Sequence, residues 1–224
     1  MTYKLVALMP MRHTSIRVPG KNYRPFGDGR LLFQHTLDSL LACDRIDKVV
    51  IDTDSDIIKR VCIEVYEDVI LLERPEHLTA DTVPMNDILA HDINMVPSEF
   101  YLQTHSTNPL VKANTFIGIV DRFFENYPFY DSLFTVTKQQ TRFWDELARP
   151  MNHNQNILLR TQDLPPVYEE NSCAYVFKGE TVLSQHNRIG ARPYMFEMDP
   201  LEARDIDEEH DFTIAEMLFQ KGLE

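Results

Sequence analysis

The chain has 224 residues, of which 43% are hydrophobic and 25% charged, and its formal net charge is -13. This length suits one sizeable domain, and the composition is ordinary for a soluble globular protein. The acidic balance argues against a general nucleic-acid binder, which needs a basic face to meet phosphates. The 3 cysteines are far apart and suit a reducing compartment, and no stretch approaches the ~20 apolar residues that span a bilayer. We therefore expect a soluble, cytoplasmic protein with no nucleic-acid or membrane partner.

Short apolar runs, typical of buried strands, alternate with segments of helical periodicity along most of the chain. The expected strands are 3–9, 48–52, 69–72, 100–102, 132–136, 174–177 and 194–198. The expected helices pass through 32–41, 57–61, 84–89, 116–124 and 212–218, with a further helix between 177 and 194. Such alternation indicates βαβ units, so the expected fold class is α/β, with a Rossmann-like, mostly parallel sheet flanked by helices.

The alternation of strands and helices fails between residues 138 and 170. This segment is polar and contains Trp144, the only tryptophan of the chain. We predict an arm that packs on something else, carried by a single domain spanning residues 1–224.

The loop that follows the first expected strand carries only positive charge. Residues 9–22 read MPMRHTSIRVPGKN and include Arg12, Arg17 and Lys21, whereas the first acidic residue of the chain is Asp28. Loop amides, Arg12 and Lys21 could together neutralise a triphosphate. The spacing fits neither a P-loop nor a dinucleotide fingerprint, and a solvated surface loop with scattered charges is the alternative. We expect Lys21 to face solvent, so that its removal affects ligand binding and not the fold.

In open parallel sheets, ligands bind beyond the carboxyl ends of the strands. Several loops of this chain follow expected strands and should converge on one site. These loops are 10–29, 53–56, 73–83 and 103–111. In the second of them, Asp54 is expected to cap a helix or to lie beside the cap.

An acidic segment precedes the last expected helix. Asp205 and Asp207 alternate along a short extended stretch, so both carboxylates should point the same way. Mg²⁺ favours one or two carboxylates completed by water and substrate phosphates. On charge alone, a merely solvated acidic turn is an equally good interpretation. Asp211 is expected to cap the last helix.

A series of segments, taken in chain order, matches the short patterns of one enzyme family. They are RHTSIRVPGKN at 12–22, DTDS at 52–55, ERPEHLTADT at 73–82, HSTNPL at 105–110, RTQDLPPVYEENSCAYVF at 160–177 and ARDIDEEHDF at 203–212. Each match alone is weak evidence, but together they run in register along nearly the whole chain. On these segments the chain resembles the acylneuraminate cytidylyltransferases, which make CMP-sialic acid and related CMP-activated nonulosonates.

The resemblance implies an enzyme that joins CMP from CTP to the anomeric hydroxyl of an acylneuraminate-like nonulosonic acid and releases pyrophosphate. It also implies the nucleotide-diphospho-sugar transferase type of fold, with Mg²⁺ as cofactor. In addition, it implies a homodimer in which the arm at 138–170 dimerises and covers the partner's site.

The resemblance also implies a role for each matching residue. Arg12 and Lys21 hold the phosphates, and with Asp207 they are the catalytic candidates. The implied nucleotide-binding residues are Arg12, Ser15, Lys21, Asn22, Arg74 and Asp81, the sugar-binding residues are His105, Arg160, Gln162 and Tyr175, and the metal ligands are Asp205 and Asp207. For Arg74, a surface arginine before a proline turn is the alternative. Without the resemblance, Tyr175 is interpreted as a core residue.

Some positions depart from the family's patterns. Ser15-Ile16-Arg17 replaces S-K-G and is closer to relatives that act on pseudaminic or 3-deoxy-octulosonic acids. His105 stands where a glutamine usually contacts the sugar, and Ser172 replaces the glycine of an N-G pair. A structural histidine is the alternative for His105. Two other functions therefore stay open: a cytidylyltransferase for another 2-keto sugar acid (pseudaminate, legionaminate or 3-deoxy-octulosonate), and a non-catalytic nucleotide-binding module.

Overall fold

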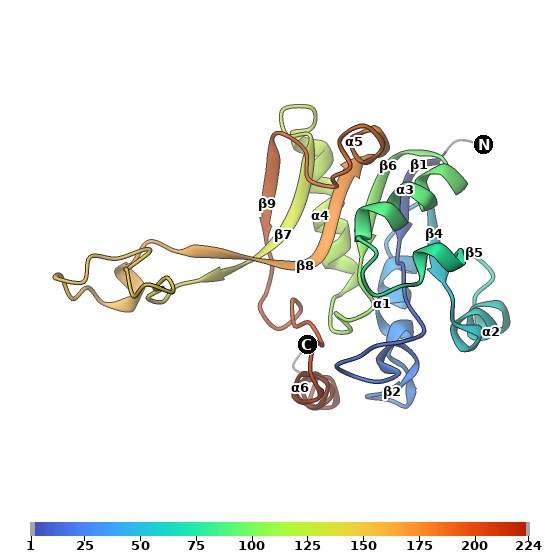
Figure 1. Cartoon of the computed structure of the whole chain (residues 1–224), viewed down its shortest axis with the longest axis horizontal. Helices are drawn as coiled ribbons and strands as arrows, with labels where there is room; N and C mark the ends of the chain where they lie inside the picture. Colours follow the sequence, from blue (N-terminus) through green and yellow to red (C-terminus); the bar gives the residue numbers. More distant parts are fainter. Residues whose placement is uncertain (1–2, 223–224) are drawn as a thin grey trace.

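A computed structural model describes residues 3–222 of the chain (Figure 1). The strands are β1 (Tyr3–Leu8), β2 (Pro25–Phe26), β3 (Arg30–Leu31), β4 (Lys48–Thr53), β5 (Val69–Glu73), β6 (Ser98–Thr104), β7 (Ser132–Gln139), β8 (Val167–Lys178) and β9 (Pro193–Glu197). The α-helices are α1 (Leu32–Leu41), α2 (Asp56–Val65), α3 (Met85–Met95), α4 (Ala113–Asn126), α5 (Gly179–Gln185) and α6 (Glu209–Gln220). Short 3-10 turns occur at η1 (Lys21–Tyr23), η2 (Glu76–Leu78) and η3 (Thr161–Asp163).

The main sheet has seven strands in the order β5-β4-β1-β6-β8-β7-β9. The pairs β1–β4, β1–β6, β4–β5 and β7–β9 are parallel. The prediction of an α/β fold with a mostly parallel sheet is therefore confirmed. Only β8 runs against its neighbours β6 and β7. Its direction follows from its connection: β7 and β8 are joined as a long hairpin, whereas parallel neighbours need a crossover.

Helices cover both faces of this sheet because successive side chains of a strand point to opposite faces. Leu5 and Ala7 of β1 belong to a core shared with α1, α2 and α4. Val6 and Leu8 of the same strand belong to a second core, shared with α3 and α5. None of the helices within residues 3–222 is both long and apolar enough to cross a bilayer.

A third apolar cluster joins α6 to the segment that follows β1. Val18, Phe26 and Leu32 pack there with Ile206 and Phe212. The free energy gained by burying apolar surface is proportional to the area buried. This cluster therefore holds the C-terminal segment against the N-terminal loop. The acidic residues around Ile206 are thereby placed beside the cationic loop.

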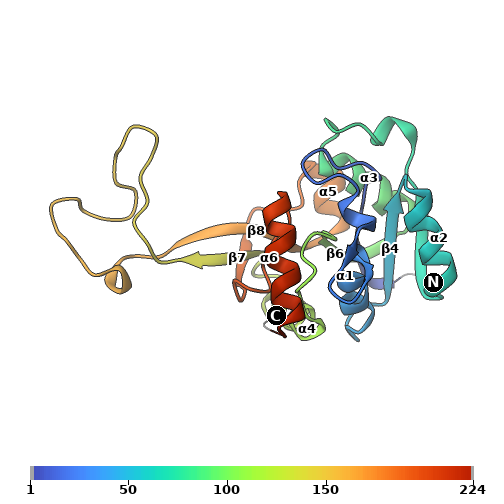
Figure 2. The ribbon, with the colours of Figure 1, turned by 90° about the horizontal axis from the view of Figure 1, so that it is seen from below.

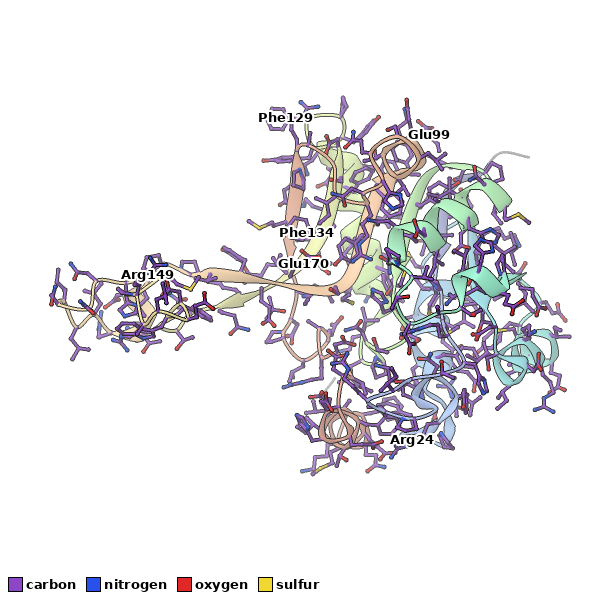
Figure 3. The ribbon with its side chains drawn as sticks, viewed as in Figure 1. Arg24, Glu99, Phe129, Phe134, Arg149 and Glu170 are labelled. Carbon is purple, nitrogen blue, oxygen red and sulfur yellow. The ribbon has the colours of Figure 1, made fainter. Side chains whose placement is uncertain are left out.

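The segment between β7 and β8 forms an arm that projects from the globular body (Figure 2). Arg149 lies on the arm and Glu170 lies where the arm meets the body (Figure 3). Large apolar side chains of the arm are exposed to solvent, and Leu158 is the extreme case at 90% exposure. The other exposed apolar residues of the arm are Trp144, Leu147, Met151, Ile157 and Leu159.

Candidate active site

A cavity of about 680 Å³ lies at the carboxyl-terminal edge of the parallel strands. Its wall is formed by the loops that follow β1, β5 and β6, together with the segment before α6. Most of the residues selected from the sequence line it, namely Arg12, Ser15, Lys21, Asn22, Arg74, Asp81, His105, Asp205 and Asp207. The volume is that of an ordinary small-molecule site.

The 53–56 loop stays outside the wall and supports it from behind. The backbone N–H of His13 donates to Asp54 Oδ1 at 2.7 Å, which ties this loop to the cationic one. Ser55 is the N-cap of α2, and its Oγ accepts from the N–H of Ile58. Asp54 therefore lies beside the cap.

The cationic side chains of the first loop are paired with carboxylates across the cavity. Arg12 donates to Asp81. Arg17 Nη2 donates to Asp207 Oδ1 at 2.6 Å. These pairs are partly exposed, so their net contribution to stability is small. The arginines can therefore leave these carboxylates and bind a more highly charged anion such as a triphosphate.

Lys21 is not solvent-facing, and this expectation from the sequence is wrong. Its side chain is only 13% exposed. The ammonium group donates to the backbone carbonyl of Ile206 and lies 4.0 Å from Asp207 Oδ1. Burial lowers the pKa of Lys21, while Asp205 and Asp207 act in the opposite direction. Lys21 thus joins the two charged segments as well as facing the cavity.

Asn22 connects the loops that follow β1 and β6. Its Nδ2 donates to the carbonyl of Arg12 at 2.9 Å, and its Oδ1 accepts from Ser106 Oγ at 2.9 Å. The residue is buried, with 8% exposure. Both ends of its amide are satisfied, so Asn22 fixes the backbone that carries Arg12.

Arg74 is buried and is not a surface arginine. Its guanidinium donates to the Asp52 carboxylate and, at 3.2 Å, to the Asp52 carbonyl. Asp92 of α3 lies behind this pair, and burial, followed by the Asp52 charge, raises the pKa of Asp92 to about 9. Asp52, Asp92 and the half-buried His91 also present ligand atoms within 4.8 Å of one another, so these residues could hold a metal ion.

Asp205 and Asp207 both face the cavity and fit the predicted Mg²⁺. Asp205 Oδ1 is buried and accepts no hydrogen bond from any described residue. Burial raises the pKa of Asp205, and Asp207 adds to this effect. A divalent cation would satisfy the orphaned oxygen and relieve the repulsion, and carboxylate oxygens are the ligands that Mg²⁺ prefers.

The expectation that Asp211 caps α6 is wrong by three residues. Glu208 is the N-cap, and Asp211 lies at the third helical position of a capping box. Asp211 Oδ2 accepts from the backbone N–H groups of Asp207 at 3.2 Å and of Glu208 at 2.9 Å. It therefore fixes the backbone of a predicted metal ligand.

Arg160, Gln162 and Tyr175 do not line the cavity of their own chain. Arg160 lies on the arm with its side chain 73% exposed, paired with Asp163 at 2.7 Å. Gln162 is on the same part of the arm, where its carbonyl accepts from Gln140. Tyr175 is buried in β8, and its hydroxyl donates to Glu170 and lies 3.1 Å from Ser172 Oγ, which can donate to it.

Ser172 lines the cavity in a backbone conformation that favours glycine. Its φ is 57°, in the left-handed region. The glycine of the family's N-G pattern therefore has a conformational reason at this position. In this chain, serine occupies it and adds a hydroxyl to the wall.

The structure adds Gln103 and Arg188 to the candidates. Arg188 Nη1 donates to Gln103 Oε1 at 2.5 Å, and its guanidinium lies 3.6 Å from the centre of the Tyr175 ring. Gln103 Nε2 lies 3.1 Å from His105 Nε2. Arg188 follows α5 in a segment without a recognisable pattern, so no signal in the sequence marks it.

This arrangement is that of a nucleotidyltransferase: a Rossmann-like sheet whose strand ends carry a cationic loop beside a pair of carboxylates. The family model described as Cytidylyltransferase matches residues 6–222. The chain therefore belongs to the cytidylyltransferase family, and the resemblance seen in the sequence is confirmed.

Individual relatives are distant. The N-acylneuraminate cytidylyltransferase of Streptococcus agalactiae serotype V is 24% identical over 235 residues, which cover 98% of this chain and 55% of the relative. The chain thus spans about half the length of that protein. The post-translational flagellin modification protein B of Campylobacter coli is 24% identical over 215 residues, covering 91% of this chain and 90% of the relative.

Solved structures share the fold at low identity. A CMP:2-keto-3-deoxy-manno-octonic acid synthetase in complex with CTP has a TM-score of 0.72 and 12% identity, covering 98% of this chain and 99% of the other. A 4-diphosphocytidyl-2C-methyl-D-erythritol synthase from Anaerococcus prevotii has a TM-score of 0.66 and 13% identity, covering 97% and 99%. Both matches span the arm as well as the body.

Proposed function

We propose that this chain transfers CMP from CTP to the anomeric hydroxyl of an acylneuraminate-like nonulosonic acid and releases pyrophosphate. One observation carries the proposal: in a member of the cytidylyltransferase family, a single cavity is lined by the cationic Arg12 and Lys21 together with the carboxylates Asp205 and Asp207. The cations suit a triphosphate, and the carboxylates beside them suit the metal that accompanies it.

In the proposed reaction, the anomeric hydroxyl oxygen attacks the α-phosphorus of CTP and gives up its proton to solvent, while the bond from that phosphorus to the pyrophosphate oxygen breaks. The protein's part is mainly positioning and charge stabilisation. Arg12 and Lys21 would neutralise the phosphate oxygens, and Arg74, held by Asp52, would line the nucleotide side of the cavity. Asp205 and Asp207 would hold Mg²⁺, which when bound neutralises phosphate charge and orients an in-line displacement.

The proposal includes a homodimer formed through the arm. The arm exposes several large apolar side chains to solvent, and Leu158 is the most exposed of them. A hairpin that stayed in solvent would not need these side chains, and large exposed apolar patches mark interaction sites. Arg160 and Gln162 lie on this arm, away from the cavity of their own chain. In a dimer, the arm would present them to the partner's cavity.

A second candidate acceptor is another 2-keto sugar acid, such as pseudaminate, legionaminate or 3-deoxy-octulosonate. The observation that favours it is the sugar side of the cavity, where His105 and Ser172 differ from the residues of the sialate pattern. The C. coli relative, which matches nearly end to end, is named for flagellin modification and not for an acylneuraminate.

The test is to incubate the full chain with CTP, Mg²⁺ and each of these sugar acids, and to measure pyrophosphate release. Release with N-acetylneuraminate alone supports the first proposal, and release with another acid alone supports the second. Binding of CTP without turnover on any acceptor would instead identify a non-catalytic nucleotide-binding module. Arg12→Met serves as the negative control. It removes a charge proposed to bind the phosphates, so pyrophosphate release should fall, while the third apolar cluster stays intact.

A further inference from the structure

The side-chain amide of Gln103 is held in one orientation by its partners. Its Oε1 accepts from Arg188 Nη1 at 2.5 Å, and a guanidinium can only donate. Its Nε2 donates to the carbonyl of Thr104 at 3.0 Å, and a carbonyl can only accept. Gln103 is fully buried, so water cannot substitute for these partners. The amide therefore cannot be flipped without breaking both bonds.

The orientation of Gln103 decides which ring nitrogen of His105 carries a proton. Because one hydrogen of Gln103 Nε2 is used on the Thr104 carbonyl, the second is available to His105 Nε2, which lies 3.1 Å away. That ring nitrogen must then accept, so in the neutral imidazole the hydrogen is on Nδ1. No described residue hydrogen-bonds to Nδ1, and His105 lines the cavity.

The surroundings also keep His105 uncharged. Burial lowers its pKa to about 3, and the positive charges of Arg188 and Lys21 act in the same direction. A proton on His105 Nε2 would additionally make it a donor facing the donor Gln103 Nε2, which is unfavourable. Tyr175 lies on the far side of Arg188, in cross-strand register with Gln103, and its ring holds the guanidinium in place.

We propose that Arg188 and Gln103 act as positioning residues that lock His105 as a neutral imidazole protonated on Nδ1. His105 then donates a hydrogen bond from Nδ1 to an oxygen of the acceptor sugar acid, and it does not remove the proton from the attacking hydroxyl. The identity of this ligand rests on the proposed function, whereas the tautomer of His105 does not.

The chain of hydrogen bonds from Arg188 through Gln103 to His105, called the relay below, has a consequence for specificity. A fixed N–H donor in the cavity wall favours ligands that place an oxygen there, because a ligand that covers the donor without accepting from it leaves it unpaired. Ligands with an apolar group or a donor at the same point are disfavoured. His105 thereby becomes a specificity-determining residue of the sugar side.

The tautomer can be measured without any substrate. The full chain is labelled with ¹⁵N-histidine, the His105 ring signals are assigned from their loss in His105→Asn, and the ring ¹⁵N shifts are followed from pH 5 to 8. The expected result is a protonated Nδ1 and an unprotonated Nε2 throughout. A protonated Nε2, or an imidazolium forming near pH 6, overturns the proposal.

Gln103→Glu and Arg188→Met test the relay itself. The carboxylate introduced by Gln103→Glu would place an acceptor, and no donor, next to His105 Nε2. The ring proton should therefore move from Nδ1 to Nε2. Arg188→Met removes one of the two bonds that orient the amide of Gln103, together with a nearby positive charge, so the preference for the Nδ1 tautomer should weaken. Arg122→Met is the matched control, because Arg122 also lies over a tyrosine ring but on a remote surface. An unchanged His105 signal in Gln103→Glu refutes the relay.

Steady-state kinetics test the donor role on the acid that is turned over. In asparagine the amide nitrogen occupies nearly the position of Nδ1, so His105→Asn should keep the KM for the sugar within about threefold. His105→Leu should raise it by about tenfold or more, which corresponds to ~1.4 kcal/mol, with the KM for CTP unchanged. Equal effects of the two substitutions overturn the donor role. Absence of turnover on every acid would refute the proposed function but leave the tautomer result standing.

Discussion

Asp92→Asn should change how the stability of this protein depends on pH. Asp92 is fully buried behind the Arg74–Asp52 pair, and its pKa of about 9 lies far above the ordinary value of 3.8. Between these two values the native state binds one proton more than the unfolded state. The free energy of unfolding therefore falls with rising pH, by ~1.4 kcal/mol per unit. Asparagine carries no proton to bind or release, so this dependence should disappear.

The magnitude follows from the one-proton difference. Between pH 5 and pH 8, wild type should lose roughly 4 kcal/mol more than Asp92→Asn, because each unit contributes ~1.4 kcal/mol. The assay is urea unfolding of both proteins across this range. Glu146→Gln, at an exposed position on the arm, controls for the loss of one acidic group.

Parallel pH dependences for wild type and Asp92→Asn would refute the reasoning. That result would mean that Asp92 is ionised in the native protein. The ionised carboxylate would then need a counter-charge, and a cation held by Asp52, His91 and Asp92 is the arrangement the geometry allows. Unfolding in the presence of a chelator distinguishes that case, because loss of a bound cation lowers stability.

The remaining predictions concern the cavity and the arm. Lys21→Ala should abolish most turnover and also cost about 1.5–3 kcal/mol in urea unfolding, since it removes a charged donor from the Ile206 carbonyl; unchanged stability would contradict the observed contact. Asp207→Asn should raise the Mg²⁺ concentration needed for half-maximal turnover at saturating CTP, and an unaltered Mg²⁺ titration would show that the acidic turn holds no metal. Asp52→Asn should destabilise by about 3–5 kcal/mol because it leaves Arg74 buried without its counter-charge, and a melting temperature equal to wild type would count against that. Leu158→Ser combined with Ile157→Ser should yield a monomer by light scattering, whereas a dimer of unchanged affinity would exclude the arm as the interface.

The sequence predicted the elements and the chemistry of the loops well. Periodicity located the helices and strands, because apolar spacing of 2 or 3.6 residues is a local property of the chain. The one-signed loop at Arg12–Lys21 and the alternating Asp205 and Asp207 were readable as charge patterns. The structure brings both segments to one cavity, as expected of loops at the carboxyl ends of parallel strands.

The environments of individual side chains were less predictable. Lys21 was expected in solvent, but its side chain is only 13% exposed and its ammonium group donates to the Ile206 carbonyl. Asp211 was expected to cap α6, but Glu208 takes that position, because the helix begins one residue after Glu208 and not after Asp211. The burial of Lys21 depends on Ile206, 185 residues away, which no local window contains. The start of α6 is a local matter, since the capping box joins Glu208 and Asp211.

By itself, then, this sequence determines an α/β chain with a cationic loop, an acidic pair and an arm, because each of these is encoded in neighbouring residues. Tertiary structure alone decides which side chains share a wall. Arg188 and Gln103 are 85 residues apart, and Lys21 and Ile206 are 185 apart. Their meeting depends on how β6 and β8 pair and on where α6 packs. The proton of His105 is therefore fixed by the fold, although every residue that fixes it is visible in the sequence.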